Sequence, residues 1–554
     1  MSYNETGPNP SRRHVLGMML AGGAVSVFAP NMLGRDRAMA QDGAPTGQMI
    51  LGFSQEPTQF NPHMSHIEVD DGTHFALYDT LFTIDPQGLF KASLCTDVPS
   101  IGNGGISADG LQWRIKLREG VTWHDGKPFT AEDVKFTFDL LADPAFNAWR
   151  RTGFDLVRDI EIVSPTELTW RMERLFAPFP AILAGTFIVP KHGFDGVADK
   201  NAAPFNNAPI GTGPFKLVQR VPGDRIEFIA NPDYFGEGPY VERFFIKYIP
   251  DVTVMYTQFV SGDIDIVGIA YIQPDNYAEA TKLPDRVTQL LPSSAVECIA
   301  FNLEHAVLKE LPVRQAIYHA VDKAAIISTL YYGLPTATDS YVPQQSYYYN
   351  PGLPKHEFSL EKASALLDEA GWVKGSDGIR EKNGVRLSFD NSTTVGNNLR
   401  EQLQQVLQQS LASIGVEMKI SNMPADVLFG DFWFQSKFQT LIFGEGFLAG
   451  GDPDVTNYFK STASNAKGGS GLNFWQFVNP EVDELLVKGS SSFVPEERRD
   501  AYFRIQEIIR EQLPFMTIYQ YVAVGGQKKG VDGVEPNVNV RINNWNVSSW
   551  RWAA

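Results

Sequence analysis

The chain has 554 residues, of which 43% are hydrophobic and 20% charged, a balance typical of a soluble globular protein with a sizeable core. Its net charge of −17 argues against nucleic-acid binding, which needs clustered lysine and arginine. The two cysteines, Cys95 and Cys298, cannot form a metal site alone, and the sequence leaves open whether they pair or stay free.

The N-terminus has the pattern of an export signal. Arg12 and Arg13 precede a mostly apolar run at 15–29, and Ala38 and Ala40 form a small-x-small cleavage site. The paired arginines resemble a twin-arginine (Tat) signal, and the apolar run is too short and glycine-rich for a convincing spanning helix. We therefore expect residues 1–40 to be a cleaved signal read by the Tat translocon. No cysteine lies near the cleavage site to carry a lipid, so we expect a free periplasmic protein.

Strand-like and helix-like segments alternate along the rest of the chain. Apolar residues at every second position of 111–117 predict a half-buried strand. Thr130 and Asp133 then form a predicted capping box that starts a helix. Further amphipathic helices are predicted from Pro312, over 360–370 before Gly371, and over 399–414 before Gly415, with a strand at 416–420. This succession predicts α/β lobes.

Catalytic motifs are nearly absent from the sequence. There is no nucleophile elbow, zinc-binding H-E-x-x-H helix or phosphate-binding loop. His63 and His66 are close in sequence, with His74 further on, but no cysteine or nearby acidic pair completes a metal set there. Asp452 and Asp454 flank a proline and are more typical of a turn than of acid–base catalysis. We therefore predict no enzyme activity, cofactor or metal; a secreted hydrolase is the remote alternative.

An ordered series of motifs resembles one protein family. They are LREGVTWHDGKPFTAEDV at 117–134, PIGTGPF at 209–215, NPDYF at 231–235, SGDID at 261–265, FNL at 301–303, VRQAI at 313–317, EKASALLDEAGW at 361–372, GDPD at 451–454, NPEVD at 479–483 and LPFM at 513–516. Together they resemble the extracellular solute-binding proteins of family 5, which include oligopeptide-, dipeptide- and nickel-binding proteins. The resemblance covers essentially the whole chain after the signal.

The resemblance implies a periplasmic binding protein fold of the type II, or cluster C-like, kind: two α/β lobes with an extra inserted domain. Domain I would comprise 45–88, 208–295 and 521–554, domain II 89–207, and domain III 296–520. The ligand cleft would lie between domains I and III and would close by a hinge motion. The motifs themselves are mostly scaffold. His124 is expected to be a hydrogen-bonded turn residue, and Gly211 to Pro214 a tight backbone passage.

The resemblance also implies the function: a monomeric substrate-binding component of an ABC importer that delivers a peptide or similar small polar solute to its permease. Peptide-binding members hold the peptide ammonium with an aspartate before the Asp-Pro step. Here Ala449 takes that place, and Asp452 or Glu445 could serve instead. This departure keeps opines, oligosaccharides, glutathione and metal chelates open as cargo. Phe53, Phe447 and Trp475 are further candidate contacts, although each is more typical of a core residue.

Overall fold

The computed structural model describes residues 44–424, 427–448, 450–469 and 471–553, so the predicted signal at 1–40 and Ala449 lie outside the described residues. No helix in the described part of the chain combines the length and the apolar character needed to cross a membrane. Residues 41–554 form one compact unit.

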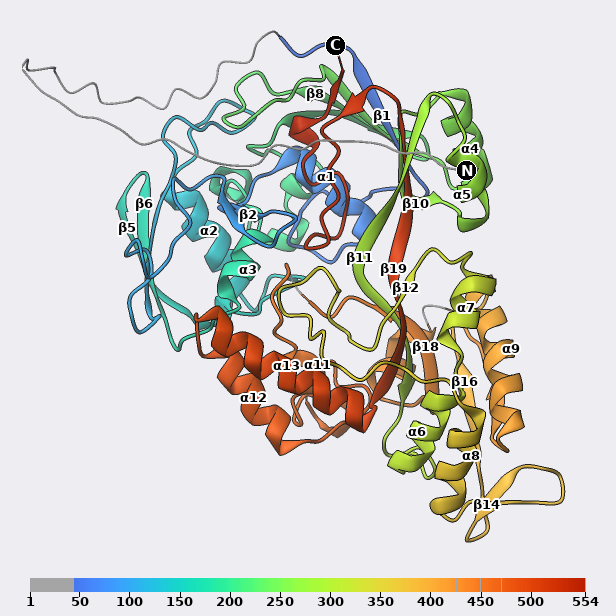
Figure 1. Cartoon of the computed structure of the whole chain (residues 1–554). Helices are drawn as coiled ribbons and strands as arrows, with labels where there is room; N and C mark the ends of the chain where they lie inside the picture. Colours follow the sequence, from blue (N-terminus) through green and yellow to red (C-terminus); the bar gives the residue numbers. More distant parts are fainter. Residues whose placement is uncertain (1–43, 425–426, 449, 470, 554) are drawn as a thin grey trace, which may run out of the picture. The chain divides into compact units, whose positions relative to one another are not determined.

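A large mixed sheet organises this unit (Figure 1). Among the described residues it has eleven strands in the order β17-β16-β18-β11-β19-β10-β1-β9-β8-β7, with β12 paired to β19. Their bounds are β1 Gln48–Phe53, β7 Phe215–Val221, β8 Arg225–Ala230, β9 Arg243–Tyr248, β10 Ile266–Ile272, β11 Arg286–Phe301, β12 Thr336–Ala337, β16 Ser388–Ser392, β17 Glu417–Ile420, β18 Thr440–Glu445 and β19 Phe515–Lys528.

Two long antiparallel strands, β11 and β19, connect the two halves of this sheet. The C-terminal part of β19 pairs with β10 on one side and with the N-terminal part of β11 on the other, whereas Val296 to Phe301 of β11 pair with β18. Their register shifts between Pro292 and Val296 and again between Glu297 and Cys298. Irregular pairing of this kind bends a ribbon locally, so these shifts mark the place where the two halves can change direction.

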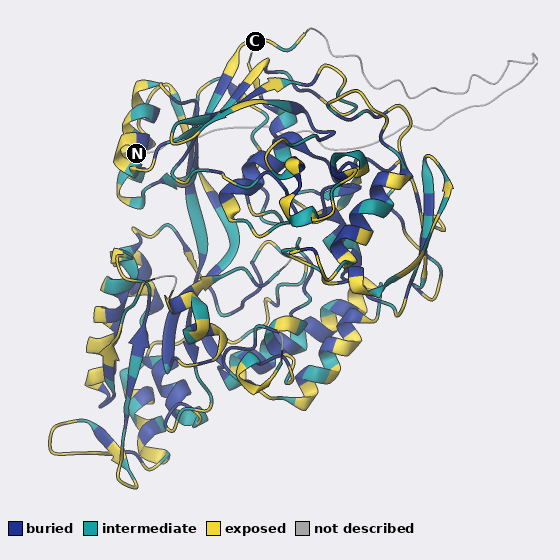
Figure 2. Ribbon diagram, turned by 180° about the vertical axis from the view of Figure 1, so that it is seen from behind, coloured by how far each residue is buried: buried dark blue, intermediate teal, exposed yellow. Residues whose placement is uncertain are grey.

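Helices cover the sheet and bury its strands, as Figure 2 shows by the contrast between buried strands and exposed outer helical faces. The main helices are α1 Glu68–Leu77, α2 Ala131–Ala142, α3 Phe179–Ala184, α4 Val252–Ser261, α5 Tyr277–Ala280, α6 Leu311–Ala320, α7 Lys323–Leu330, α8 Leu360–Glu369, α9 Asn398–Ser413, α11 Thr456–Phe459, α12 Pro480–Ser490 and α13 Pro495–Gln512. The predicted α/β class is thus confirmed.

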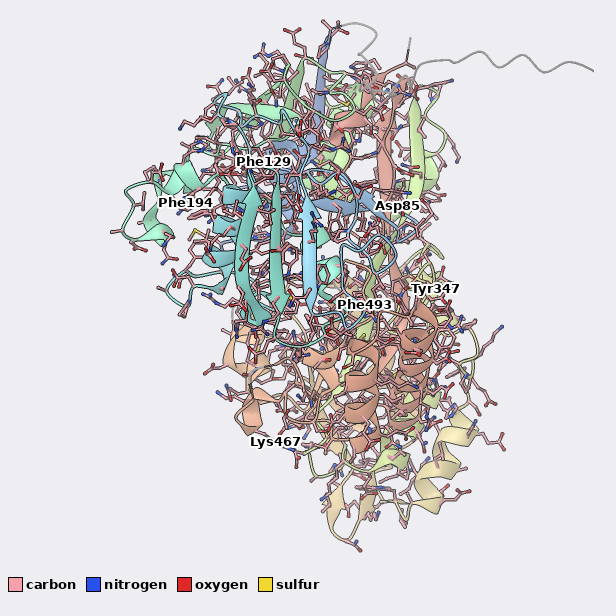
Figure 3. All side chains as sticks on the ribbon, turned by 90° about the vertical axis from the view of Figure 1, so that its left-hand side faces the viewer. Asp85, Phe129, Phe194, Tyr347, Lys467 and Phe493 are labelled. Atoms are coloured by element: carbon pink, nitrogen blue, oxygen red, sulfur yellow. The ribbon has the colours of Figure 1, made fainter. Side chains whose placement is uncertain are left out.

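A separate three-stranded sheet, β4-β6-β5, packs with α2. Its strands are β4 Gln112–Lys116, β5 Val157–Ser164 and β6 Glu167–Met172; short pairs elsewhere are β2 Phe82–Ile84 with β3 Phe90–Ala92, β13 Val373–Lys374, β14 Arg380–Lys382 and β15 Val385–Arg386, and β20 Val531–Asp532 with β21 Arg551–Trp552. In the turn between α12 and α13, Phe493 reaches the ring of Trp113 in β4, with centroids 6.2 Å apart (Figure 3).

Several local predictions are confirmed. Trp113 and Ile115 are buried in β4 between exposed neighbours, and the capping box of Thr130 and Asp133 starts α2. Pro312 lies in the first turn of α6. Both predicted helix-ending glycines have positive φ, +83° at each, a conformation that glycine adopts without strain.

His124 is a hydrogen-bonded turn residue, as expected. Its Nε2 donates to the carbonyl of Gly213 and its Nδ1 accepts from the backbone N–H of Gly211. A Cβ atom on Gly211 would lie 1.7 Å from the carbonyl oxygen of Leu77, so only glycine fits this close passage. Both cysteines, Cys95 and Cys298, are free and buried, which settles the choice that the sequence left open.

Candidate functional site

Charged and aromatic side chains from distant parts of the sequence lie together and interact with one another; we call this set of side chains the cargo group. Its members come from α1, from the loop after α2, from the end of β18, from α11 and from the C-terminal segment. They are Asp71, Trp149, Arg150, Glu445, Tyr458 and Arg541.

Asp71 and Arg541 form one side of the cargo group. Nη1 of Arg541 lies 3.2 Å from Oδ2 of Asp71, and the same guanidinium lies 4.9 Å from the ring centroid of Trp149. Burial alone would raise the pKa of Asp71, but contacts with two histidines and the charge of Arg541 lower it below its ordinary value. Asp71 is therefore an ionised carboxylate at neutral pH.

Arg150 lies against the same tryptophan. Its guanidinium is 4.1 Å from the ring centroid of Trp149, an arrangement that cation–π attraction favours. The side chain is exposed to solvent and has no carboxylate within 4.0 Å among the described residues. Nevertheless the surrounding protein and then Arg541 lower the pKa of Arg150. The charge of this accessible side chain can attract an anion from solvent.

Glu445 and Tyr458 complete the cargo group from β18 and α11. The hydroxyl of Tyr458 donates to Oε1 of Glu445 at 3.0 Å. Desolvation raises the pKa of Glu445 to about 7, although Tyr458, the Gly446 N–H, Arg541 and Arg150 all act in the opposite direction. The carboxyl group can therefore change charge near neutral pH and become ionised when a cation approaches.

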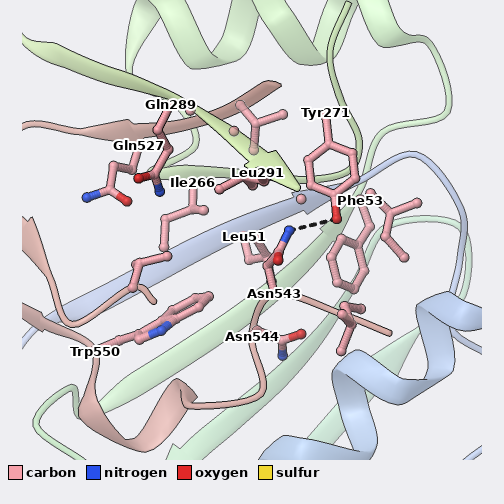
Figure 4. A pocket seen from close by; sticks show the side chains of 17 residues that line it. Leu51, Phe53, Ile266, Tyr271, Gln289, Leu291, Gln527, Asn543, Asn544 and Trp550 are labelled. Carbon is pink, nitrogen blue, oxygen red and sulfur yellow. Dashed lines mark hydrogen bonds between the residues drawn. The ribbon is translucent and has the colours of Figure 1, made fainter. Parts of the chain in front are cut away.

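A small apolar pocket lies between β1, β10 and the C-terminal segment (Figure 4). Leu51, Phe53 and Trp550 line it, and Nδ2 of Asn543 donates to the hydroxyl of Tyr271 at 2.8 Å on its polar side. The cavity volume is about 30 Å³, enough for about one or two water molecules. It is therefore too small to hold a peptide or a sugar.

Of the sequence-predicted contacts that lie among the described residues, Glu445 belongs to the cargo group, and the ring of Phe447 packs against that of its member Tyr458, with centroids 4.8 Å apart. Phe53, Phe447 and Trp475 are at most 2% exposed. The rings of Phe447 and Trp475 pack on that of Phe515, with centroids 5.2 and 4.9 Å away. Such burial is typical of core residues. Their binding of cargo stays a prediction, as does that of Ala449, which lies outside the described residues.

Asp452 already has a partner. Both its carboxylate oxygens accept from Nη2 of Arg498 at 2.8 Å, and both side chains are buried. A carboxylate engaged in this way holds the loop against α13. Of the two substitutes considered for the missing anchor, Glu445 is therefore the one that interacts electrostatically with Arg150 and Arg541.

Sequence reasoning missed most of the cargo group. Trp149 is followed by two arginines, and an aromatic residue next to paired cations in a loop would have been a usable signal. Arg541 carries no such signal, because it stands in an asparagine-rich segment near the C-terminus. His63 and His66 are close in sequence, but in the structure His66 lies with His74 beside Asp71, whereas Nε2 of His63 contacts the carbonyl oxygen of Phe187 at 2.8 Å.

Comparison of the whole chain with known proteins identifies relatives. Residues 98–469 match the family model described as "Bacterial extracellular solute-binding proteins, family 5 Middle". The chain is 29% identical over 488 residues to the oligopeptide-binding protein AppA of Bacillus subtilis, covering 85% of this chain and 86% of that protein. It is 25% identical over 503 residues to the dipeptide-binding protein of Escherichia coli, covering 86% and 90%.

Solved structures are similar too. AppA of Bacillus subtilis in complex with a nonapeptide has a TM-score of 0.76 at 27% identity, covering 92% of this chain and all of that one. NikZ of Campylobacter jejuni in complex with Ni(L-His) has a TM-score of 0.77 at 27% identity, with the same coverage. The predicted fold of a two-lobed binding protein is therefore confirmed.

Proposed function

Because the chain belongs to the bacterial extracellular solute-binding proteins of family 5, we propose that it is the substrate-binding component of an ABC importer and that its cargo carries a carboxylate. The observation that supports this cargo is Arg150, an accessible guanidinium that has no carboxylate partner among the described residues. A planar guanidinium matches a carboxylate with two parallel hydrogen bonds.

Trp149 helps to hold the two cations of the cargo group in place. The guanidinium carbons of Arg150 and Arg541 lie 4.1 and 4.9 Å from its ring centroid. Two like charges held near one ring repel each other, and that repulsion is relieved when an anion binds near them. Binding a carboxylate therefore gains electrostatic energy that a neutral solute would not.

Glu445 supplies the opposite charge. A solute with an ammonium and a carboxylate, such as a short peptide, would find a partner for each end. Two relatives that are named as peptide-binding proteins, AppA and the dipeptide-binding protein, are similar to this chain over most of its length. A peptide or a related zwitterion is therefore the favoured cargo, with Glu445 in the role that the sequence left open between Asp452 and Glu445.

Lobe closure is the proposed mechanism of delivery. Hydrophobic clusters fit the predicted domains in part: one lies largely within 81–188 and two within 296–519, whereas another joins residues of 140–205 to those of 49–78 and 215–266. The register shifts in β11 fall at the predicted boundary near 295. Opening there would separate Glu445 from Asp71 and Arg541, and closure would bring them together again and present a loaded receptor to the permease.

We place the mature protein in the periplasm after Tat export, as a monomer that docks on its permease and returns its cargo unaltered. A family of solute-binding proteins is consistent with binding without catalysis. Turnover of any bound solute would instead favour the hydrolase alternative.

Peptide amides test the cargo proposal. Di- to pentapeptides with a free C-terminus and the same peptides with a C-terminal amide would be titrated into ligand-free mature protein by calorimetry. We expect the free acids to bind at least about tenfold more tightly, since the amide cannot pair with Arg150. Equal affinity of acids and amides would contradict the proposal.

A further inference from the structure

Three side chains beside the cargo group converge on one point. Asp71 and His74 are one helical turn apart on α1, and His66 precedes that helix. One ligand atom from each, Nε2 of His66, Oδ1 of Asp71 and Nδ1 of His74, lies within 4.8 Å of the other two. His74 is fully buried, so its polar atoms cannot be satisfied by bulk water.

The hydrogen bonds on the far side of each imidazole fix which nitrogen carries the proton. Nδ1 of His66 contacts the carbonyl oxygen of Met64 at 2.8 Å, and Nε2 of His74 contacts that of Gln59 at 2.9 Å. A carbonyl oxygen can only accept, so each of these nitrogens must donate. In the neutral rings the other two nitrogens therefore hold lone pairs, and both face Oδ1 of Asp71.

This leaves three electron-pair donors facing one another. Oδ1 of Asp71 lies 2.9 Å from Nε2 of His66 and 3.5 Å from Nδ1 of His74, and the latter atom has no hydrogen-bond partner. A proton on Nε2 of His66 would give Asp71 a donor but would leave Nδ1 of His74 without a hydrogen-bond partner. Protonating both rings would place two cations, with centroids 5.0 Å apart, beside one carboxylate and Arg541. A single cation between the donors satisfies all three at once.

The distances suit a transition-metal ion. Metal–nitrogen and metal–oxygen bonds of about 2.0–2.2 Å put neighbouring ligand atoms about 3.0–3.5 Å apart in octahedral or tetrahedral geometry. The two nitrogen–oxygen distances here, 2.9 and 3.5 Å, match that range. A histidine that binds a metal through one ring nitrogen commonly donates the N–H of the other to a carboxylate, a backbone carbonyl or water, and the first of these nitrogens is then fixed in place.

We propose that His66, Asp71 and His74 bind one divalent transition-metal ion of the kind that imidazole and carboxylate ligands favour, such as Ni²⁺, Zn²⁺ or Cu²⁺. The three ligands come from one short segment, so the site exists without lobe closure and without Arg150 or Glu445. It lies next to the cargo group, because Arg541 contacts the second oxygen of Asp71 and the ring of Trp149 lies 4.4 Å from that of His66, centroid to centroid.

Calorimetry with the metals alone tests this site. Tag-free mature protein, stripped with a chelator, would be titrated separately with Ni²⁺, Zn²⁺ and Cu²⁺. We expect one equivalent of at least one of them to bind. The variants His66→Gln and His74→Gln should each weaken that binding by at least about 100-fold, because each removes a direct ligand. Electron paramagnetic resonance of the Cu²⁺ form should show two coordinated nitrogens.

A matched control is the variant His192→Gln, which removes a histidine that pairs with a different aspartate, Asp125, at 3.0 Å. Its metal binding should equal that of the parent. His66→Gln guards against misfolding of the more buried His74 variant. The proposal is overturned if the parent binds none of the three metals, or if both ligand variants keep full affinity. A negative result with the metals would not change the comparison of peptide acids with amides, so the metal proposal and the cargo proposal can be contradicted independently.

Discussion

Nη1 of Arg541, in the C-terminal segment, lies 3.2 Å from Oδ2 of Asp71, in the first helix of the described chain. The ring of Trp149, from the loop after α2, lies 4.9 Å from the same guanidinium. Three segments far apart in the sequence thus share one group of side chains. The proposed binding of a solute from several sides rests on that convergence.

Replacing Arg150 with glutamine should weaken cargo binding roughly 10- to 100-fold, because a charge-assisted hydrogen bond to a carboxylate is worth about 1.5–3 kcal/mol. The exposed side chain contributes little to folding, so the melting temperature of the ligand-free protein should stay unchanged. Calorimetry with the co-purifying solute measures the affinity. The control is Arg158→Gln, which removes an exposed arginine paired with Glu173; equal loss in both variants would count against a specific role.

Cargo binding should release protons near neutral pH through Glu445. Its pKa is about 7 in the folded protein, so at pH 6.5 most molecules carry it protonated. A bound ammonium favours the ionised form and lowers that pKa, which expels up to one proton per cargo. Without cargo the raised pKa means that stability falls as pH rises from about 4.5 to 7, because the folded state then binds more protons than the unfolded chain.

Calorimetry at pH 6.5 in two buffers of different ionisation enthalpy measures this release. The parent should show a buffer-dependent binding enthalpy, and the variant Glu445→Gln should not. Identical enthalpies in both buffers for the parent would exclude Glu445 as the partner of a cargo cation.

Removing the carboxylate of Asp452 should damage the fold and not the site. It leaves Arg498 buried without its partner, and breaking such a pair costs about 3–5 kcal/mol. Urea unfolding of Asp452→Ala should show that loss, and the double variant Asp452→Ala/Arg498→Met should recover part of it. If Asp452→Ala were as stable as the parent but had lost affinity for cargo, Asp452 would be a cargo-binding residue instead.

Export should depend on the paired arginines of the signal. Changing Arg12 and Arg13 to lysine keeps the charge but removes the residues that the Tat pathway reads. The precursor should then accumulate in the cytoplasm, measured by immunoblotting of cell fractions. Mature protein in the periplasm at the parental level would mean that another route is used.

The sequence predicted the local structure better than the site. Periodicity and capping residues identify α2, α8 and α9 because those signals lie within a few positions of one another. The pairing of Asp71 with Arg541 is set by the path of the chain through the large sheet, and no local pattern encodes it. The same limit explains Asp452, whose sequence position suggested a cargo contact while its partner, Arg498, lies on a helix further along the chain.

Native mass spectrometry of the mature protein, purified from the periplasm of the cells that produce it and then denatured, tests the central claim most directly. We predict that denaturation releases small solutes that bear a free carboxylate and are chemically unaltered. Arg150→Gln protein should carry far less of these solutes than Arg158→Gln protein. Released solutes without a carboxylate, or equal amounts from both variants, would contradict the account.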